Sequence, residues 1–245
     1  MSFYESDELL AQYMEFHYGD TWFDVANYPR ACADYCLDVL PEDRLGRALD
    51  LGCAVGRTSL ELARSFDEVV AVDLSNRFIQ QAQSLQRDGE AHWFRVDEGE
   101  LGQHRHVSLE QLGLSEAAQR VCFHQGDATA WSDGGPFDLV FAGNLIDRLP
   151  DPGAFLRDVH RHLSEGGLLV LSSPYTLLEE FTPRSHWIGG FYVAGHRVTV
   201  LEGMGAALEP RFEPCVPPED IPFVIRETRR KFQHSLAQIT VWRRL

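Results

Sequence analysis

From residue 46 onward, two hydrophobic patterns alternate along the chain. Short apolar runs, typical of buried parallel strands, are followed by segments with apolar residues at helical spacing. The runs predict strands at 47–51, 68–73, 121–125, 137–142 and 167–173, and the segments predict helices at 57–66, 76–87 and 153–163. This alternation predicts an α/β fold with a doubly wound sheet and helices on both faces.

The two ends of the chain and one internal segment depart from this alternation. Residues 5–40 have apolar positions at helical spacing, broken at Gly19 and Asp20, which predicts a helical cover. Residues 88–120 predict an inserted hairpin with a short helix at 109–118. After an irregular aromatic stretch, 174–192, we expect a helix at 196–208 and a closing antiparallel hairpin from runs 221–229 and 232–243.

We expect one domain over residues 1–245. Its parts are a helical cover (1–45), a cofactor-binding core (46–173) that contains the insertion (88–120), and a substrate loop with the closing hairpin (174–245). This length is ordinary for a single α/β domain with decorations.

Composition excludes several kinds of partner. The formal net charge of −15 disfavours nucleic acid and anionic membrane surfaces, because phosphates would be repelled. The chain opens with a polar, acidic segment instead of a signal-peptide pattern, and no apolar run reaches the roughly 18 residues of a membrane span. With five scattered cysteines, these features predict a cytoplasmic protein with reduced thiols.

The turn after the first predicted strand is the most informative motif. Gly52, Ala54 and Gly56 allow a sharp strand-to-helix turn and a close approach of a ligand, as in dinucleotide sites. Asp50 precedes this turn, and its carboxylate would repel a pyrophosphate but attract the sulfonium and ammonium groups of S-adenosylmethionine. A purely structural turn without a ligand is the alternative.

Two further carboxylates end predicted strands at the same edge of the sheet. Asp73 lies where an acidic residue accepts hydrogen bonds from ribose hydroxyls, and Asp127 lies where a carboxylate borders an adenine. Either could instead only cap a turn. The predicted cofactor-binding residues are Asp50, Gly52, Cys53, Gly56, Asp73, Leu74, Asp127, Ala128, Asn144 and Leu145.

The reacting end of the cofactor should lie near the loop after the fourth predicted strand. Asn144 can offer a carbonyl there, and Asp147 could orient or deprotonate an acceptor nitrogen, unless it is only an ion-pair partner of Arg148. Glu179, in the aromatic loop, is a third catalytic candidate. Local spacing shows no pairing of histidines and carboxylates as metal ligands, so we expect no metal site.

With these landmarks placed, the chain resembles the class I S-adenosylmethionine-dependent methyltransferases. The matching segments are 49–56, 72–73, 126–128, 137–140 and 163–167, which cover roughly residues 46–173. Ala54 stands where many members have Gly. The resemblance implies a Rossmann-like class I methyltransferase sheet with S-adenosylmethionine as the cofactor.

A closer resemblance spans almost the whole chain. Segments 16–19, 26–34, 97–100, 144–152, 172–176 and 181–183 are similar to the 4-mercaptohistidine N1-methyltransferase domain of ovothiol biosynthesis. This resemblance implies methyl transfer to an imidazole nitrogen of 4-mercaptohistidine (5-thiohistidine). It also implies association with a sulfoxide synthase, because the domain is often fused behind one.

Residues for the amino-acid substrate are inferred from position and charge. Tyr18, Asn27, Arg30 and Tyr175 are the candidates, with Arg30 suited to a bidentate grip on a carboxylate. Two other functions stay open: a methyltransferase for another small polar metabolite, and a catalytically silent S-adenosylmethionine-binding module. Asp50 disfavours a third, a nicotinamide-dependent oxidoreductase.

Overall fold

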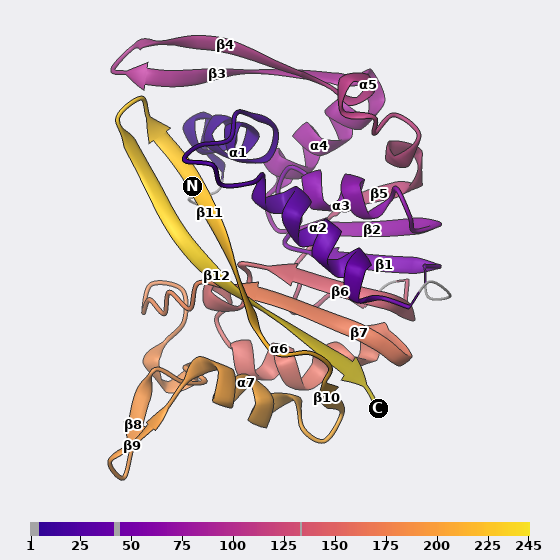
Figure 1. Ribbon diagram of the computed structural model, residues 1–245, viewed down its shortest axis with the longest axis vertical. Helices are drawn as coiled ribbons and strands as arrows, with labels where there is room; N and C mark the ends of the chain where they lie inside the picture. Colours follow the sequence, from indigo (N-terminus) through magenta and orange to yellow (C-terminus); the bar gives the residue numbers. More distant parts are fainter. Residues whose placement is uncertain (1–4, 42–44, 133) are drawn as a thin grey trace.

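A mostly parallel sheet forms the centre of the molecule (Figure 1). The computed structural model describes residues 5–41, 45–132 and 134–245. In spatial order the strands are β10 (Phe212–Pro214), β12 (Lys231–Arg244), β7 (Leu163–Ser173), β6 (Phe137–Gly143), β1 (Arg47–Leu51), β2 (Glu68–Asp73) and β5 (Val121–Gln125), and β11 (Glu219–Thr228) pairs with β12. β5, β2, β1, β6 and β7 are parallel, and β12 runs antiparallel to β7.

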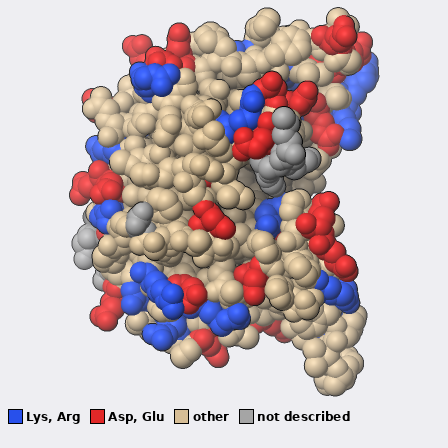
Figure 2. All heavy atoms as spheres, turned by 180° about the vertical axis from the view of Figure 1, so that it is seen from behind, with Lys and Arg blue, Asp and Glu red and all other residues tan. Residues whose placement is uncertain are grey.

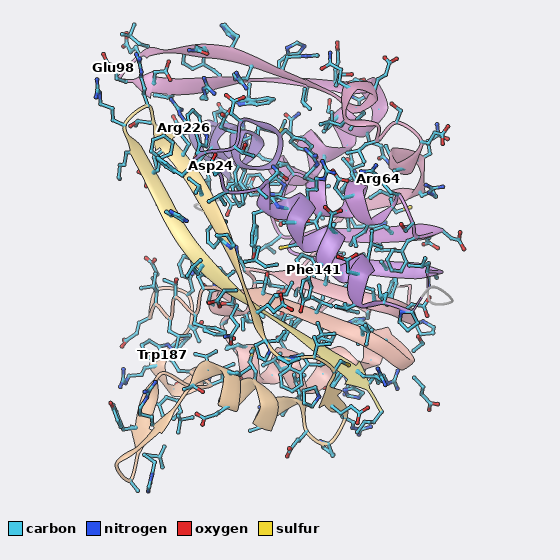
Figure 3. All side chains as sticks on the ribbon, viewed as in Figure 1. Asp24, Arg64, Glu98, Phe141, Trp187 and Arg226 are labelled. Atoms are coloured by element: carbon cyan, nitrogen blue, oxygen red, sulfur yellow. The ribbon has the colours of Figure 1, made fainter. Side chains whose placement is uncertain are left out.

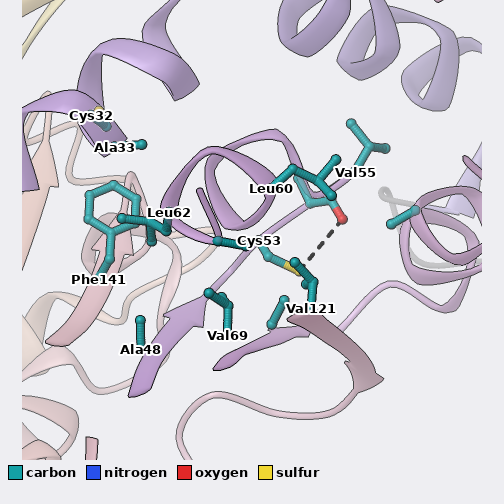
Figure 4. Close-up of a cluster of buried hydrophobic side chains, with 14 of the residues drawn as sticks. Cys32, Ala33, Ala48, Cys53, Val55, Leu60, Leu62, Val69, Val121 and Phe141 are labelled. Atoms are coloured by element: carbon teal, nitrogen blue, oxygen red, sulfur yellow. Dashed lines mark hydrogen bonds between the residues drawn. The ribbon is translucent and has the colours of Figure 1, made fainter. Parts of the chain in front are cut away.

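Helices cover both faces of the sheet, as the sequence predicts (Figure 1). The helices on one side are α1 (Asp7–Tyr18), α2 (Tyr28–Val39), α3 (Arg57–Leu62) and α4 (Asn76–Asp88), and those on the other are α6 (Pro152–Asp158) and α7 (Val200–Leu208). Each face has its own apolar core because side chains alternate along a strand. In β2, Val69 and Ala71 belong to the α1–α4 core, whereas Val70 and Val72 belong to the α6–α7 core. Figure 4 shows part of the first core.

Several element boundaries differ from the sequence-based expectations. α3 ends at Leu62 instead of residue 66, because Arg64 N donates to Glu61 O and tightens the last turn. The helix expected at 153–163 ends at Asp158 and continues as a 3-10 segment, Val159–His162. β7 begins at Leu163, four residues early, since Leu163 pairs with Phe137.

The helix expected at 196–208 begins only at Val200. Residues His196–Val198 form β9, which pairs with β8 (Phe191–Val193) in a small hairpin. Thr199 then starts the helix, because its hydroxyl accepts from Glu202 N while the Glu202 carboxylate accepts from Thr199 N. The expected helix start therefore overlooked a strong capping box.

The inserted hairpin packs against other parts of the fold and is more than a surface decoration. It consists of β3 (Glu90–Glu98) and β4 (Leu101–Ser108), followed by α5 (Leu109–Leu112) and a 3-10 segment, Ala117–Arg120. Its strand β3 packs on α1, and its tip meets the β11–β12 hairpin, where Arg229 N donates to Asp97 O over 3.0 Å. Figure 3 shows Glu98, at the end of β3, close to the tip that carries Arg226.

Glu15 of α1 ties the cover to this hairpin. Its side chain is 4% exposed, and its carboxylate accepts from Trp93 Nε1 and from Arg95 Nη1, each over 3.0 Å. Asp20, after α1, accepts from the same Arg95 and from Arg105, each over 2.6 Å. The network therefore fixes α1 on β3 through buried, charge-assisted hydrogen bonds, and the exposed Asp20–Arg105 pair extends it to β4.

The surface carries charges of both signs. Figure 2 shows acidic and basic residues interspersed toward the margins of one face, around a broad uncharged area. This mixture differs from the basic stripe that nucleic acid binding requires. Within residues 5–41, 45–132 and 134–245, every helix is too short or too polar to cross a bilayer.

Candidate active site

A cavity of about 570 Å³ opens at the carboxyl ends of the parallel strands. Its floor comes from the ends of β1, β2 and β6, where ligands of open α/β sheets bind. Its cover comes from α1, α2, β11 and β12. The lining includes nine of the ten predicted cofactor-binding residues, namely Asp50, Gly52, Cys53, Asp73, Leu74, Asp127, Ala128, Asn144 and Leu145.

The tenth residue, Gly56, lies outside the cavity lining but permits the conformation of the turn. Its φ of +86° is a left-handed conformation, and a Cβ there would lie 2.5 Å from the Phe123 ring. Gly52 has φ +80°. Ala54 adopts φ +48°, in the region that glycine prefers, which fits the observation that it replaces a glycine in the resemblance. The residues of the turn that line the cavity, Gly52, Cys53 and Ala54, are small, so the backbone of the turn stays close to the cavity.

Asp50 is the most deeply placed charge of the cavity. Its side chain is 1% exposed, and Oδ2 accepts from Ser59 Oγ over 2.5 Å. The pKa of the Asp50 carboxyl is raised to about 7, mainly by burial and in smaller part by the nearby Asp73 charge, while the Ser59 hydrogen bond opposes the rise. A cation placed beside this carboxyl would favour its ionised form, as the sequence argument for S-adenosylmethionine requires.

Asp73 connects the glycine turn to the start of α4. Its Oδ2 accepts from Ala54 N over 2.8 Å, and its Oδ1 accepts from Ser75 N over 2.9 Å. Burial raises the pKa of the Asp73 carboxyl, and these two N–H groups oppose that rise. Ser75 in turn caps α4 by accepting from Phe78 N. Asp73 therefore has a structural role as well as a place on the cavity wall.

Asp127 likewise combines two roles. Its Oδ1 accepts from Thr129 N over 2.8 Å and from Thr129 Oγ1 over 2.7 Å, which is the turn-capping alternative. Asp127 and Ala128 also line the cavity. Cys53 is buried in the turn, where its thiol donates to Ala54 O over 3.7 Å (Figure 4).

Asn144 meets a residue that sequence reasoning missed. Asn144 has φ +51°, a left-handed conformation that Asn tolerates, and its N donates to Ser172 O. Tyr28, at the start of α2, donates its hydroxyl to Asn144 Oδ1 over 3.1 Å and lies 2.8 Å from Ser172 Oγ. A Tyr hydroxyl and an Asn amide thus meet at the wall where an acceptor would lie.

The structure places the other two catalytic candidates outside the cavity lining. Asp147 is 2% exposed, and its carboxylate accepts from Arg148 Nη1 over 3.1 Å and from Ser173 Oγ over 3.2 Å. Burial raises the pKa of Asp147, while Arg148 lowers it. Arg148 itself lines the cavity, so Asp147 positions a lining residue. Glu179 is exposed on the loop after β7.

The four substrate candidates also lie outside the lining. The Tyr18 hydroxyl donates to Val55 O over 2.8 Å. Asn27 caps α2 by accepting from Arg30 N, and its amide donates to His17 O. Arg30 is exposed, 3.5 Å from Asp34. The Tyr175 hydroxyl donates to Gln238 Oε1 over 2.9 Å.

The covering wall of the cavity comes from segments far apart in the sequence. From α1 and the start of α2 come Tyr13, Phe16, His17, Tyr28 and Pro29, and from the C-terminal hairpin come Phe223, Ile225, Gln233 and Ser235. Burial, helped by Arg57, lowers the pKa of His17 to about 3, so this imidazole is neutral. The register explains the hairpin set, because Phe223 is opposite Ser235 and Ile225 is opposite Gln233, on one face.

Comparisons with known proteins agree with this geometry. Residues 25–200 match the family described as "Methyltransferase domain". The chain belongs to this family. Its fold is that of the class I methyltransferases, and S-adenosylmethionine is the cofactor.

Individual relatives are more distant. The chain is 32% identical over 128 residues to a ubiquinone biosynthesis O-methyltransferase of Caulobacter sp. (strain K31), covering 52% of this chain and 40% of that protein. It is 27% identical to a trans-aconitate 2-methyltransferase of Azoarcus sp. (strain BH72), covering 59% and 45%. The match thus spans less than half the length of either relative.

Solved structures extend the likeness over nearly the whole chain. The N-methyltransferase NodS from Bradyrhizobium japonicum WM9, in complex with S-adenosyl-L-homocysteine, aligns with a TM-score of 0.57 and 16% identity. The alignment covers 98% of this chain and 99% of that one. The likeness at this identity concerns the fold alone.

The cavity fits the cofactor by its donor set. The glycine turn exposes backbone beside Asp50, the Asp73 carboxylate stands at the end of β2, and Asp127 and Ala128 stand at the end of β5. Carboxylates at these places attract a sulfonium and an ammonium group and accept from ribose hydroxyls and an adenine amine. When bound, S-adenosylmethionine supplies an electrophilic methyl group.

Proposed function

We propose that this methyltransferase acts on an imidazole nitrogen of 4-mercaptohistidine and forms ovothiol. One observation supports this acceptor above all. The segments that carry the closer resemblance come from distant parts of the chain, yet four of them line one cavity, through Phe16, His17, Tyr28, Pro29, Asn144, Leu145, Arg148, Leu149, Pro150, Pro174 and Thr176. Recognition of a particular acceptor would place its distinguishing residues together in this way.

The chemistry of the covering wall suits a small, neutral heterocycle. Tyr28, Gln233 and Ser235 of this wall and the neighbouring Asn144 offer hydroxyl and amide groups, beside the apolar side chains of Phe16, Phe223 and Ile225. A neutral imidazole has one N–H donor and one lone pair. If an amide oxygen holds the N–H, the other nitrogen keeps its lone pair for the methyl group.

The protein contributes alignment and exclusion of water. A methyl displacement requires the acceptor nitrogen, the carbon and the sulfur in line, with reacting atoms about 3 Å apart. Tyr28 and Asn144 orient the acceptor from one side, and the Glu15 network holds α1 over the cavity. Asp147 holds Arg148 at the cavity wall, which makes Asp147 a positioning residue.

The decisive experiment is mass spectrometry of the product from 5-thiohistidine and S-adenosylmethionine. We expect one added methyl group on the thiolated compound and none on histidine, which is the matched control. A catechol and a tricarboxylic acid in parallel test the other acceptor classes; methylation of either, with 5-thiohistidine unchanged, would overturn the proposal. Cofactor binding by calorimetry without any product would indicate a silent binding module instead.

Asp147→Asn tests the positioning role. We expect turnover to fall about tenfold or more, with S-adenosyl-L-homocysteine affinity within about twofold, because an orienting contact matters mainly for reaction geometry. Ser173→Ala, which removes the other partner of Asp147, should cause a smaller loss of the same kind. Equal loss of turnover and cofactor affinity would point to a general defect in folding.

A further inference from the structure

The outer face of the β3–β4 hairpin gathers two histidines and a carboxylate. His92 of β3 is directly opposite His106 of β4, and Glu90 precedes His92 by two residues, on the same face. All three side chains are exposed. They lie outside the cavity lining, so the methyl-transfer site does not account for them.

Their ligand atoms already lie at metal-binding separations. One ligand atom from each residue can be chosen so that all lie within 4.8 Å of one another. His106 Nε2 is 3.2 Å from Glu90 Oε2, and the rings of His92 and His106 are 4.7 Å apart. Bonds of about 2.0–2.2 Å around a tetrahedral zinc ion place neighbouring ligand atoms roughly 3.3–3.5 Å apart. The 3.2 Å between His106 Nε2 and Glu90 Oε2 is close to this separation.

The backbone under the three residues is held rigidly. The opposite face of the hairpin, with Ala91, Trp93 and Val107, is buried in the core. At the base of the hairpin, Leu109 N donates to Gly89 O over 2.8 Å. The exposed side chains can therefore adjust to an ion while their Cα positions stay fixed, which lowers the entropic cost of binding.

We propose that Glu90, His92 and His106 bind a divalent late transition-metal ion, Zn²⁺ in the first place, with one coordination position left for water or an external ligand. Two imidazoles and one carboxylate suit Zn²⁺ and its neighbours better than Mg²⁺ or Ca²⁺, which prefer oxygen ligands. Local spacing predicted no metal site because His92 and His106 meet only through strand pairing.

Bound metal would also strengthen the cover. The site joins the two strands next to Trp93, whose indole donates to Glu15 of α1. An ion that binds only the folded hairpin stabilises the folded protein in proportion to the logarithm of its concentration over its dissociation constant. The metal thus acts on stability and leaves the methyl-transfer chemistry to the cavity.

The test is titration of the tag-free, chelator-treated full chain with Zn²⁺ and Co²⁺. We expect one saturable site by calorimetry, cobalt d–d absorption bands typical of histidine and carboxylate ligands, and a higher Tm with Zn²⁺. His106→Ala removes a direct ligand. Loss of a group that only supports a metal ligand already costs roughly 10–100-fold in affinity, so this change should weaken binding by at least that factor and should abolish the Tm shift.

His104→Ala is the matched control, because His104 lies two residues from His106 on the same strand, opposite Phe94. It should retain the wild-type affinity and Tm shift. Three results would overturn the proposal: no saturable binding, equal loss in both variants, or binding that survives His106→Ala. Because the three ligands are exposed, circular dichroism should show both variants folded.

Discussion

The floor and the cover of the cavity are built by different kinds of contact. On the floor, the contacts of Asp50, Asp73 and Asp127 with Ser59, Ala54 and Thr129 join residues within about 20 positions of one another. In the cover, Tyr28 reaches Asn144 and Ser172 across 116 and 144 positions, and Glu15 reaches Trp93 across 78. We therefore expect local motifs to hold the cofactor, and tertiary packing to create the surface that meets the acceptor.

This contrast predicts that the two parts can be damaged separately. Changes on the floor should reduce cofactor affinity, and changes in the cover should affect stability and acceptor use. If every variant lost both functions together, the cavity would be one cooperative unit and the contrast would fail.

Asp73→Ala should have the largest effect. It removes a buried carboxylate that accepts from Ala54 N and Ser75 N and faces the cavity. The two hydrogen bonds that Asp73 would accept from ribose hydroxyls contribute about 1.5–3 kcal/mol each, because they involve a charged group. We therefore expect S-adenosyl-L-homocysteine affinity to fall at least about 100-fold by calorimetry. Asp67→Ala, an exposed acid before the other end of β2, is the control. Unchanged affinity in Asp73→Ala would contradict this assignment.

Glu15→Ala should destabilise the cover. Removing one partner of a buried ion pair costs about 3–5 kcal/mol, and Asp20 still compensates Arg95, so we expect about 3 kcal/mol less free energy of unfolding in urea. Glu8→Ala, an exposed acid on the same helix, should change stability by less than about 0.5 kcal/mol. Under conditions that keep Glu15→Ala folded, its KM for the acceptor should rise more than its Kd for the cofactor. A larger rise in Kd would show that α1 contributes mainly to the cofactor-binding floor.

Asp50 gives the floor a pH dependence of its own. Its pKa is raised to about 7, against about 3.9 in an unfolded chain, so the protonated carboxyl favours folding at low pH and this contribution is lost as pH rises from about 4 through 7. A cationic ligand needs the ionised carboxyl, so cofactor affinity should rise by up to about tenfold per pH unit below 7 and level off above it.

Calorimetry between pH 5.5 and 8.5 measures this dependence, and proton release on binding can be read from buffers of different ionisation enthalpy. Asp50→Asn should flatten the profile and weaken affinity at pH 8, while its apo form should gain stability relative to the wild type as pH rises. A wild-type profile that is flat across pH 7 would show that Asp50 does not titrate on binding.

The same contrast explains how far the sequence could be interpreted. The parallel sheet, the closing hairpin and the floor residues follow from periodicity and from small or acidic residues at strand ends, which are local signals. The two helices of the cover, α1 and α2, were predicted, but the residues that they turn toward the cavity were not. Tyr28 and Arg30 are two positions apart on a helix and so point to different sides. Charge favoured Arg30, whereas packing buries Tyr28 and leaves Arg30 exposed.

Arg30 and Gln233 therefore provide the finest test, with the smallest expected effect. Arg30 forms an exposed pair with Asp34, and such pairs contribute about 0–1 kcal/mol. We expect Arg30→Ala to leave the acceptor KM within about twofold in steady-state assays, since it removes no lining group. Gln233→Ala deletes an amide that lines the cavity, and loss of one neutral hydrogen bond, about 1 kcal/mol, should raise KM roughly fivefold. If Arg30→Ala raised KM more than Gln233→Ala, the acceptor would have to enter from the outer side of α2. The charge of Arg30 would then indicate the substrate site better than the cavity lining does.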